Sequence, residues 1–326
     1  MKRIAFVAHD PGSFDVLYPV YEKIMDEAVF LAVGPSSSRC LEYAISTEEW
    51  ETFLSRMAAS GNLAGIVLGR NWGTDLDVRL LAFSRKRNLR TVVILDYWSN
   101  YAVSFRDKGK EYWPDAYLVM DELARREAIA EGVPANILKI VGQPGLDKLC
   151  TQKRCHRQPG KDVLFLSDPL SLLYGDSLGY TEQTVLLDVL KACKVCSRQL
   201  KIKFHPKDDP LFRQKYQDIS VDGDVDELMG DYKVVIGMST MALLHAALMG
   251  IPIVSYQPDL CKKDFCITNR LGLSRCLKSY EELEKILNGT MDWRPTERLK
   301  DTLPFWFDGK STERTVAAVR EILGES

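Results

Sequence analysis

The feature that most constrains the fold is a repeated alternation of short apolar runs with helical patterns. The first run, RIAFVA, ends in the polar, glycine-containing turn HDPGS and is followed by helical spacing in VLYPVYEKIM. Five more runs rich in β-branched residues follow: VFLAVG, AGIVLG, TVVILD, AYLVM and LKIVG. Such runs are typical of strands buried in a parallel sheet. The sequence therefore predicts an open α/β domain of the Rossmann-like type over residues 1–145.

The alternation restarts after a polar, basic interval, which we interpret as a linker over residues 146–160. The segments DVLFLS, LKIKF, a short DIS, KVVIG and IPIVSY are predicted strands, with helices expected at 181–197, 224–229 and 240–249. This pattern predicts a second Rossmann-like parallel-sheet domain over 161–305. The amphipathic pattern ERTVAAVREIL makes the segment 306–326 a candidate for a helix that crosses back to the first domain.

The composition indicates an ordinary soluble globular protein. Of the 326 residues, 46% are hydrophobic and 27% charged, and a net charge of −2 favours neither nucleic acid nor an anionic membrane. No window has the roughly 20 apolar residues of a membrane helix, and the first apolar run is interrupted too early for a signal peptide. We therefore expect a cytoplasmic protein that does not bind nucleic acid.

Several cofactor classes lack their sequence signatures. There is no GxxxxGK[ST] loop and no GxGxxG fingerprint after a strand, which disfavours nucleoside triphosphatases of the phosphate-loop type and nicotinamide dehydrogenases. Asp75 and Asp77 lie in an expected helix start rather than in a metal-binding DxD loop. The eight cysteines are interpreted as thiols rather than zinc ligands. We expect no metal and no cofactor other than a nucleotide-sugar substrate.

Polar residues cluster where predicted strands of the second half end, which is where ligands bind in parallel sheets. Gly237 closes one strand and Ser239 and Thr240 open a helix, whose free N–H groups and positive dipole suit a phosphate. Alternatively, Ser239 is only an N-cap. Ser167 and Asp168 end another strand, and we count Asp168 among the nucleotide-binding candidates.

The segment KIKFHPKDD places His205, Pro206 and Lys207 at a further strand end. An imidazole there can donate a hydrogen bond or a proton to a leaving phosphate near neutral pH, with Lys207 close by. The alternative is a solvated histidine that ends an edge strand, with Pro206 as a strand terminator.

In the first half, AHDPGSFDV places His9 and Asp10 at a strand end, with Gly12 and Ser13 at a helix start. Either His9 or Asp10 could remove a proton from an acceptor hydroxyl, or Asp10 could simply cap a turn. A second candidate is LDYWSNY, where Asp96, Trp98 and Asn100, with Tyr101, could form a wall for a sugar ring or could pack in the domain. The same two alternatives apply to the three residues that follow another strand, Arg70, Asn71 and Trp72.

KFHPKDD followed by VVIGMSTMALLHAALMGIPIVSY resembles the nucleotide-binding half of GT-B-type glycosyltransferases, above all bacterial sialyltransferases and CDP-glycerol transferases. The segment from YLVMDELARR to GQPGLDKL is similar to the domain-joining region of UDP-GlcNAc 2-epimerases. The resemblance implies two domains that face a cleft, phosphate contacts from the His-Pro and Ser-Thr pairs, and an acidic residue near the ribose or sugar, here Asp259. The acidic Asp/Glu-Asp/Glu-Gly motif and the paired glutamates of some relatives are absent.

These features predict a metal-independent glycosyltransferase that moves a sugar from a nucleotide-sugar donor to a glycan or small-molecule acceptor in bacterial-type glycan biosynthesis. Two alternatives stay open: a nucleotide-sugar 2-epimerase-like enzyme and a nonenzymatic nucleotide-sugar-binding subunit. The basic residues of the linker, Lys153, Arg154, His156 and Arg157, leave open either a solvated linker or a peripheral membrane contact.

Overall fold

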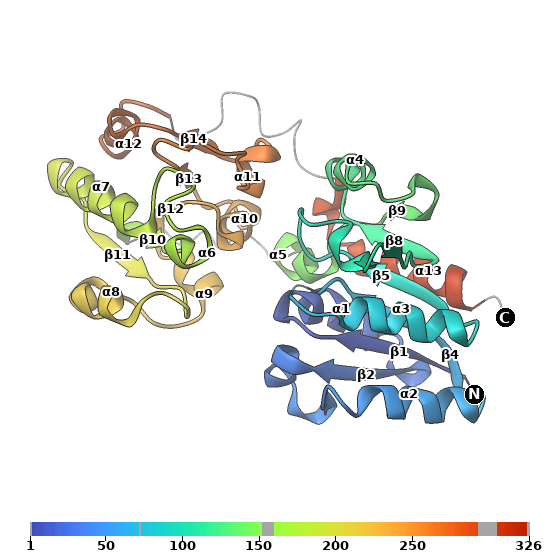
Figure 1. Cartoon of the computed structure of the whole chain (residues 1–326). Coiled ribbons are helices and arrows are strands. Elements are labelled where there is room, and N and C mark those ends of the chain that lie inside the picture. The colour runs from blue at the N-terminus through green and yellow to red at the C-terminus, as the bar shows by residue number, and fades with distance from the viewer. Residues whose placement is uncertain (1, 72, 152–159, 293–304, 325–326) are drawn as a thin grey trace. The chain divides into compact units, whose positions relative to one another are not determined.

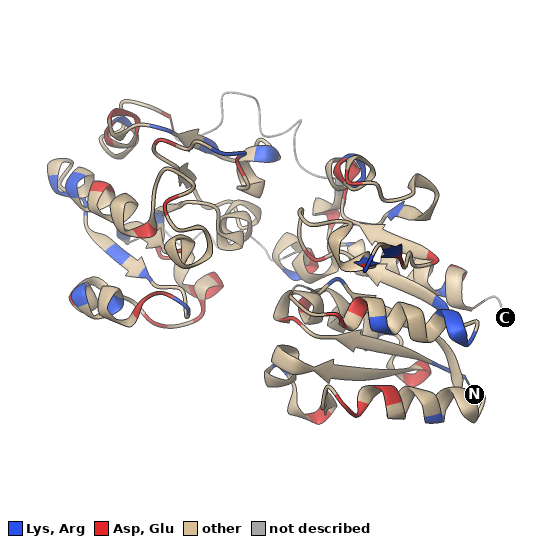
Figure 2. Cartoon of the chain, viewed as in Figure 1, with Lys and Arg blue, Asp and Glu red and all other residues tan. Residues whose placement is uncertain are grey.

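The computed structural model describes residues 2–71, 73–151, 160–292 and 305–324. The chain divides into two compact units, Met1–Thr151 with Phe305–Ser326, and Gln152–Pro304 (Figure 1). Most of the predicted linker, along with its basic residues, lies outside the described part, as does Trp72. Residues of both charge signs are interspersed along the helices of each unit (Figure 2). Among the described residues, no helix has the length and apolar character to cross a membrane.

The first unit contains a seven-stranded, entirely parallel sheet. Every apolar run predicted to be a strand is one, because each run is buried between the helices that flank the sheet. The sheet order is β3 (Ala44–Ile45), β2 (Ala28–Val33), β1 (Arg3–Ala8), β4 (Leu63–Gly69), β5 (Arg90–Ile94), β8 (Ala116–Val119) and β9 (Leu138–Ile140). A hairpin of β6 (Arg106–Asp107) and β7 (Lys110–Glu111) was not predicted, since two-residue strands carry no periodicity.

The helices of this unit follow the strands as crossovers. The apolar faces of the first and the last of them join the strand side chains in one core, in which Phe6, Leu17 and Ile94 are fully buried. The helices are α1 (Pro11–Lys23), α2 (Trp50–Ala59), α3 (Leu76–Lys86), α4 (Glu122–Ala130), α5 (Asp147–Thr151) and α13 (Ser311–Leu323). Short 3-10 helices include η2 (Gly34–Ser38) and η9 (Phe305–Asp308).

Helix α13 belongs to the first unit, although about 150 residues of the second unit precede it in the chain. The Asp147 carboxylate accepts hydrogen bonds from the backbone N–H groups of Ser311 at 3.0 Å and Thr312 at 2.6 Å. This carboxylate therefore satisfies two donors at the start of the helix and complements its dipole. Gly142 has φ +98°, and a Cβ there would lie 2.7 Å from Cβ of Trp306, so the returning chain requires glycine at this position.

The second unit contains a five-stranded parallel sheet. Its order is β11 (Leu200–Lys203), β10 (Lys161–Leu166), β12 (Tyr232–Gly237), β13 (Ile253–Tyr256) and β14 (Arg275–Leu277). The helices are α6 (Leu170–Tyr174), α7 (Glu182–Val195), α8 (Pro210–Lys215), α9 (Val225–Met229), α10 (Met241–Leu248), α11 (Ile267–Arg270) and α12 (Tyr280–Leu287).

One predicted strand of this unit is wrong. The segment DIS is mostly the 3-10 helix η7 (Gln217–Ile219), and only an isolated bridge joins Ser220 to Ile202. A single apolar residue, Ile219, gives this segment no buried face, so local turns replace a sheet ladder.

Each sheet has one point at which the strand order reverses. In the first unit, β1 lies between β2 and β4, and in the second unit β10 lies between β11 and β12. Loops diverge to opposite faces at such a point and leave room for a ligand at the carboxyl ends of the strands. The fold therefore directs attention to the segments after β1 and β4, and to those after β10 and β12.

Candidate functional site

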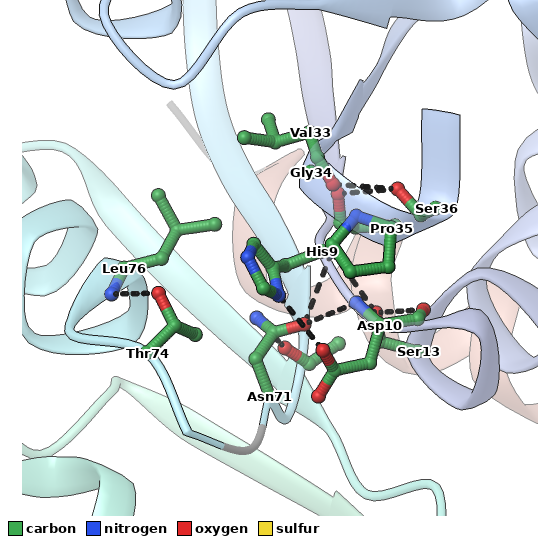
Figure 3. A network of polar contacts seen from close by, with 12 residues as sticks. His9, Asp10, Ser13, Val33, Gly34, Pro35, Ser36, Asn71, Thr74 and Leu76 are labelled. Carbon is green, nitrogen blue, oxygen red and sulfur yellow. Dashed lines mark hydrogen bonds and ion pairs between the residues drawn. The ribbon is translucent and has the colours of Figure 1, made fainter. Parts of the chain in front are cut away.

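In the first unit, a histidine and an aspartate form a pair directly after β1. Nδ1 of His9 lies 2.7 Å from Oδ1 of Asp10. The His9 side chain is 15% exposed, and Nε2 forms no hydrogen bond to a described residue. Figure 3 shows the second ring nitrogen pointing away from Asp10. A carboxylate that accepts from Nδ1–H orients the ring and leaves Nε2 as the proton acceptor.

The backbone of this pair is held by two polar side chains from different elements. Oγ of Ser13 accepts from the N–H groups of His9 and Asp10, both at 3.1 Å, and donates to the carbonyl oxygen of Asp10. Oδ1 of Asn71, which follows β4, accepts from the same two N–H groups at 3.1 and 3.2 Å. Ser13 is fully buried, so its hydroxyl fixes the loop rather than facing a ligand.

Asn71 is itself fixed by a buried carboxylate of α3. Its Nδ2 donates to Oδ1 of Asp77 at 2.6 Å, and its backbone N–H donates to Oδ2 at 3.1 Å. Burial raises the pKa of Asp77 to about 6, while the hydrogen bonds from Asn71 oppose the rise. Asp75 is the N-cap of α3 and Asp77 lies in its first turn, as the sequence predicted.

The His9 ring also depends on the 3-10 helix η2. The Ser36 N–H donates to the His9 carbonyl oxygen at 2.8 Å, and Oγ of Ser36 donates to the Ala8 carbonyl oxygen at 2.9 Å. Figure 3 shows Ser36 beside His9 and Gly34. Gly34 has φ +59°, and a Cβ there would lie 2.7 Å from Nε2 of His9. Glycine is thus required at this position, both by the backbone conformation and by the ring above it.

Asp96, after β5, lies at the start of α1. A Cβ built on Gly12 would lie 2.5 Å from Oδ2 of Asp96, so only glycine leaves room for this carboxylate. Oδ1 of Asp96 is buried and has no hydrogen-bond partner among the described residues. Burial raises the pKa of Asp96 to about 6, the positive charge of Arg70 opposes the rise and the charge of Asp10 adds to it. His9, Asp10, Gly12 and Asp96 are thus brought together at one sheet edge.

The aromatic residues after β5 pack inside the first unit. Trp98 and Tyr101 are each 1% exposed. The indole N–H of Trp98 donates to Oδ2 of Asp121 at 2.9 Å, and the Trp306 N–H donates to the same oxygen at 3.3 Å. The structure thus corresponds to the packing alternative for these rings. Asn100 adopts a left-handed conformation with φ +54° in the turn and is half-buried.

In the second unit, the loop from β12 to α10 is held by a carboxylate that follows β10. The backbone N–H of Ser239 donates to Oδ2 of Asp168 at 3.2 Å. Thr240, rather than Ser239, is the N-cap, and its hydroxyl accepts from the Ala242 N–H at 3.3 Å. Asp168, Ser239 and Thr240 therefore meet at one place. Gly237 ends β12, where it is packed against Leu243.

His205 lies in the loop after β11. One backbone hydrogen bond determines which ring nitrogen carries the proton of the neutral imidazole. The Lys207 backbone N–H donates to Nδ1 of His205 at 3.1 Å, so Nδ1 accepts and the proton resides on Nε2. Burial lowers the pKa of His205, although the charge of Asp208 opposes the shift. His205 is half-buried, whereas Pro206 and Lys207 are exposed. A neutral imidazole with Nε2–H is a hydrogen-bond donor at physiological pH.

A second buried carboxylate lies beside His205. Asp208 is 4% exposed, and its Oδ2 accepts from the His205 backbone N–H at 2.8 Å. Its Oδ1 has no hydrogen-bond partner among the described residues. Burial raises the pKa of Asp208, while the adjoining Ser167 hydroxyl opposes the rise. The predicted residue Asp259 lies in the loop after β13 with φ +56°, and its carbonyl oxygen faces Gly179.

The sequence analysis did not identify the buried residues that contact His205 and Asp96. Asp208 stood in the quoted segment KFHPKDD, but nothing in the sequence distinguished it from Asp209, which caps α8. Gln143 was also missed, although its Nε2 donates to the Asp96 carbonyl oxygen at 2.8 Å. Its place in GQPG, at the carboxyl end of β9, was the available signal. Among the described residues, no group of three or more His, Cys, Asp or Glu side chains is arranged to hold a metal ion.

The chain has two units, each with a parallel sheet whose strand order reverses once, as in the GT-B class of α/β folds. Comparison with solved structures supports the same fold class. UDP-GlcNAc 2-epimerase from Methanocaldococcus jannaschii is similar with a TM-score of 0.66 and 12% identity, over 98% of this chain and 99% of its own. MnaA of S. aureus, solved with UDP, is similar with a TM-score of 0.68 and 11% identity, over 99% of this chain and 97% of its own.

HepE of Anabaena, solved with UDP and glucose, is similar with a TM-score of 0.58 and 15% identity, over the full length of both chains. At identities this low, the likeness establishes the fold alone. No family model and no curated protein sequence matches the chain.

Proposed function

We propose that the protein is a metal-independent glycosyltransferase that moves a sugar from a nucleotide-sugar to an acceptor hydroxyl during glycan biosynthesis. The observation that carries this proposal is the pair of His9 and Asp10, with Nδ1 held at 2.7 Å and Nε2 left without a described partner. Such a pair is suited to remove a proton from a hydroxyl group. It lies at the reversal point of the sheet in the first unit.

In this mechanism, Nε2 of His9 takes the proton of the acceptor hydroxyl, and Asp10 stabilises the imidazolium that forms. The acceptor oxygen forms a bond to the anomeric carbon while the bond from that carbon to the phosphate oxygen breaks. The electron pair leaves with the nucleotide phosphate. In the second unit, Nε2–H of His205 and the helix start at Thr240 are the donors for the developing negative charge.

The nucleotide-sugar part of the proposal is supported by the fold and by the loops. Structures that share the fold carry UDP, UDP-GlcNAc or UDP-glucose. In this chain, the imidazole of His205 follows β11 and the start of α10 follows β12, and both lie at the carboxyl ends of the strands, where parallel sheets bind ligands. The uridine ligands of these structures make uridine nucleotides the first to test, ahead of the cytidine nucleotides that the His-Pro resemblance favours.

A second candidate function is a 2-epimerase-like reaction on a nucleotide-sugar. It is favoured by the likeness to UDP-GlcNAc 2-epimerases over 98% of the chain. The two reactions differ in one respect, since an epimerase converts its substrate without an acceptor. Incubation with UDP-GlcNAc alone, followed by NMR of the sugar, separates them: a second sugar epimer identifies an epimerase, whereas unchanged or slowly hydrolysed substrate is expected of a transferase.

The experiment that tests the proposal is calorimetric titration of the full chain with UDP, CMP, CDP and GDP. We expect one nucleotide to bind preferentially, and the His205→Ala variant to bind it about tenfold more weakly through loss of one hydrogen bond to a charged group. Leu211→Ala, which alters a side chain 74% exposed on α8, is the matched control and should bind as the wild type does. If none of the four nucleotides binds, the proposal is wrong, and a nonenzymatic role in which the segment KFHPKDD is only a strand end gains support.

A further inference from the structure

The candidate phosphate site of the second unit contains buried carboxyl groups as well as donors. Asp168 is 8% exposed, Asp208 4% and Glu182 2%. They come from three elements: the ends of β10 and β11, and the first turn of α7. Both Asp208 and Glu182 act on Asp168 and raise its pKa, so the three groups lie within one electrostatic environment.

Of these carboxyl groups, Glu182 is engaged by donors at both oxygens and Asp208 at one oxygen. Glu182 accepts from the Ser171 N–H at 2.9 Å and from the Ser171 hydroxyl. Asp208 accepts from the His205 N–H through Oδ2, while its buried Oδ1 has no described partner. The buried hydroxyl of Ser167 adjoins Asp208 and opposes the rise of its pKa. A buried oxygen without a described partner, such as Oδ1 of Asp208, indicates a missing partner.

Three ionised carboxylates would repel a phosphate strongly in a buried site. The donors in these loops are neutral: the Ser239 N–H and the Thr240 hydroxyl, which Asp168 engages, and Nε2–H of His205 in the loop after β11. A phosphate therefore binds favourably only if at least one carboxyl group loses its charge. The group in contact with the α10 loop itself is Asp168.

We propose that Asp168 is a binding residue that acts as a neutral carboxylic acid, donating a hydrogen bond to the nucleotide phosphate, so that nucleotide-sugar binding takes up a proton at this side chain. The inference rests on the proposed function and specifies how its phosphate site accepts an anion. A neutral carboxyl group has one O–H donor while its other oxygen still accepts from the Ser239 N–H.

The surroundings of Asp168 favour it as the group that takes the proton. Burial raises the pKa of Asp168 to about 7, with smaller contributions from Asp208 and Glu182, while Ser239 and Thr240 oppose the rise. Burial raises the pKa of Asp208 as well, but hydrogen bonds from the Ser167 hydroxyl and the His205 N–H oppose that rise. The phenol of Tyr180 also interacts electrostatically with Asp168.

The test is calorimetric titration of the full chain with UDP-glucose, or with the sugar derivative of whichever nucleotide binds, at about pH 8 in Tris and in HEPES. A nucleotide-sugar has no terminal phosphate that titrates near pH 6, so a bound proton must come to the protein. We expect the binding enthalpies in the two buffers to differ by an amount that corresponds to uptake of about one proton. Affinity should fall about tenfold per pH unit above the pKa of Asp168.

Asp168→Asn keeps an oxygen for the Ser239 N–H and supplies an amide donor that does not titrate. We expect this variant to bind at about pH 8 at least as tightly as the wild type, with no buffer-dependent enthalpy and no pH dependence between about pH 6.5 and 8.5. Asp168→Ala should bind more weakly at every pH, which separates loss of a donor from loss of a charge. An unchanged unfolding transition of each variant shows that the unit is intact.

The outcomes distinguish this inference from the proposed function. Tight binding with equal enthalpies in the two buffers would overturn the proton uptake and leave the glycosyltransferase proposal intact. Buffer dependence that persists in Asp168→Asn would also overturn the role of Asp168, because another group then takes the proton, and would leave the glycosyltransferase proposal intact. Failure of all the nucleotides and of UDP-glucose to bind would overturn the proposed function and this inference together.

Discussion

Gly12 lies directly against the carboxylate of Asp96, since a Cβ built on Gly12 would come within 2.5 Å of Oδ2. The contact joins the first turn of α1 to the loop after β5, two elements that are more than 80 residues apart in the chain. It explains why the helix begins Pro-Gly-Ser. The contact also fixes a carboxyl group whose pKa the charge of Asp10 raises.

Gly12→Ala is therefore expected to displace Asp96 and to destabilise the first unit by about 1–3 kcal/mol, the usual effect of overpacking. Chemical unfolding of the purified variant measures the change. Gly160→Ala is the control for the glycine-to-alanine change itself, because no atom of the described residues lies within 4 Å of a Cβ at that position. Equal stability of the two variants would show that the close contact does not constrain the chain.

The pair of His9 and Asp10 leads to a prediction about turnover. His9→Ala should lower kcat by about 10²–10⁴-fold and leave the KM of the nucleotide-sugar nearly unchanged, because the imidazole acts on the acceptor. Asp10→Asn should also lower kcat, since an amide no longer stabilises the imidazolium. Asp15→Asn is the control, because Asp15 lies on α1, which follows the pair, and forms a surface ion pair with Arg39 at 3.6 Å. A His9→Ala variant with full activity would exclude His9 as the base.

The buried carboxyl group of Asp168 leads to a prediction about stability and pH. Its pKa is raised from 3.8 to about 7, so the folded state holds a proton that the unfolded state has lost between these values. Its contribution to stability is thus fully present below about pH 4 and is lost as the pH rises through 7. Unfolding of the wild type should become easier from pH 5 to pH 8 relative to Asp168→Asn, which cannot titrate. Parallel pH profiles of the two proteins would contradict this assignment.

The sequence allowed most of the fold to be predicted, because the strands of both sheets are buried runs bounded by polar turns. VVIG and IVSY are strands for this reason, whereas the DIS segment lacks a buried face and forms η7. Pairs that are adjacent in sequence were also found, since His9 and Asp10 touch within one loop. The predicted cleft between two domains stays a prediction.

Contacts between distant segments could not be predicted in the same way. Trp98 follows a strand end, as a ligand-binding aromatic residue would, and only its bond to Asp121, 23 residues further along the chain, shows that it packs. Serine is the better N-cap residue by preference, yet Thr240 is the N-cap of α10, and the Ser239 N–H instead donates to the distant carboxylate of Asp168. Such long-range hydrogen bonds leave no periodic pattern in a single sequence.

Asp147 leads to the last prediction, which concerns how the chain returns to the first unit. Its carboxylate accepts from two backbone N–H groups at the start of α13, so Asp147→Ala leaves both donors without this partner and removes a favourable charge at the helix N-terminus. We expect a loss of about 1–2 kcal/mol, which is the range measured for helix caps. Asp75→Ala is the control, because Asp75 is the N-cap of α3 but its side chain makes no capping hydrogen bond. Limited proteolysis should release the α13 segment faster from Asp147→Ala than from Asp75→Ala; equal rates would mean that the apolar face of α13, with Val319 and Leu323 buried, holds the helix without the cap.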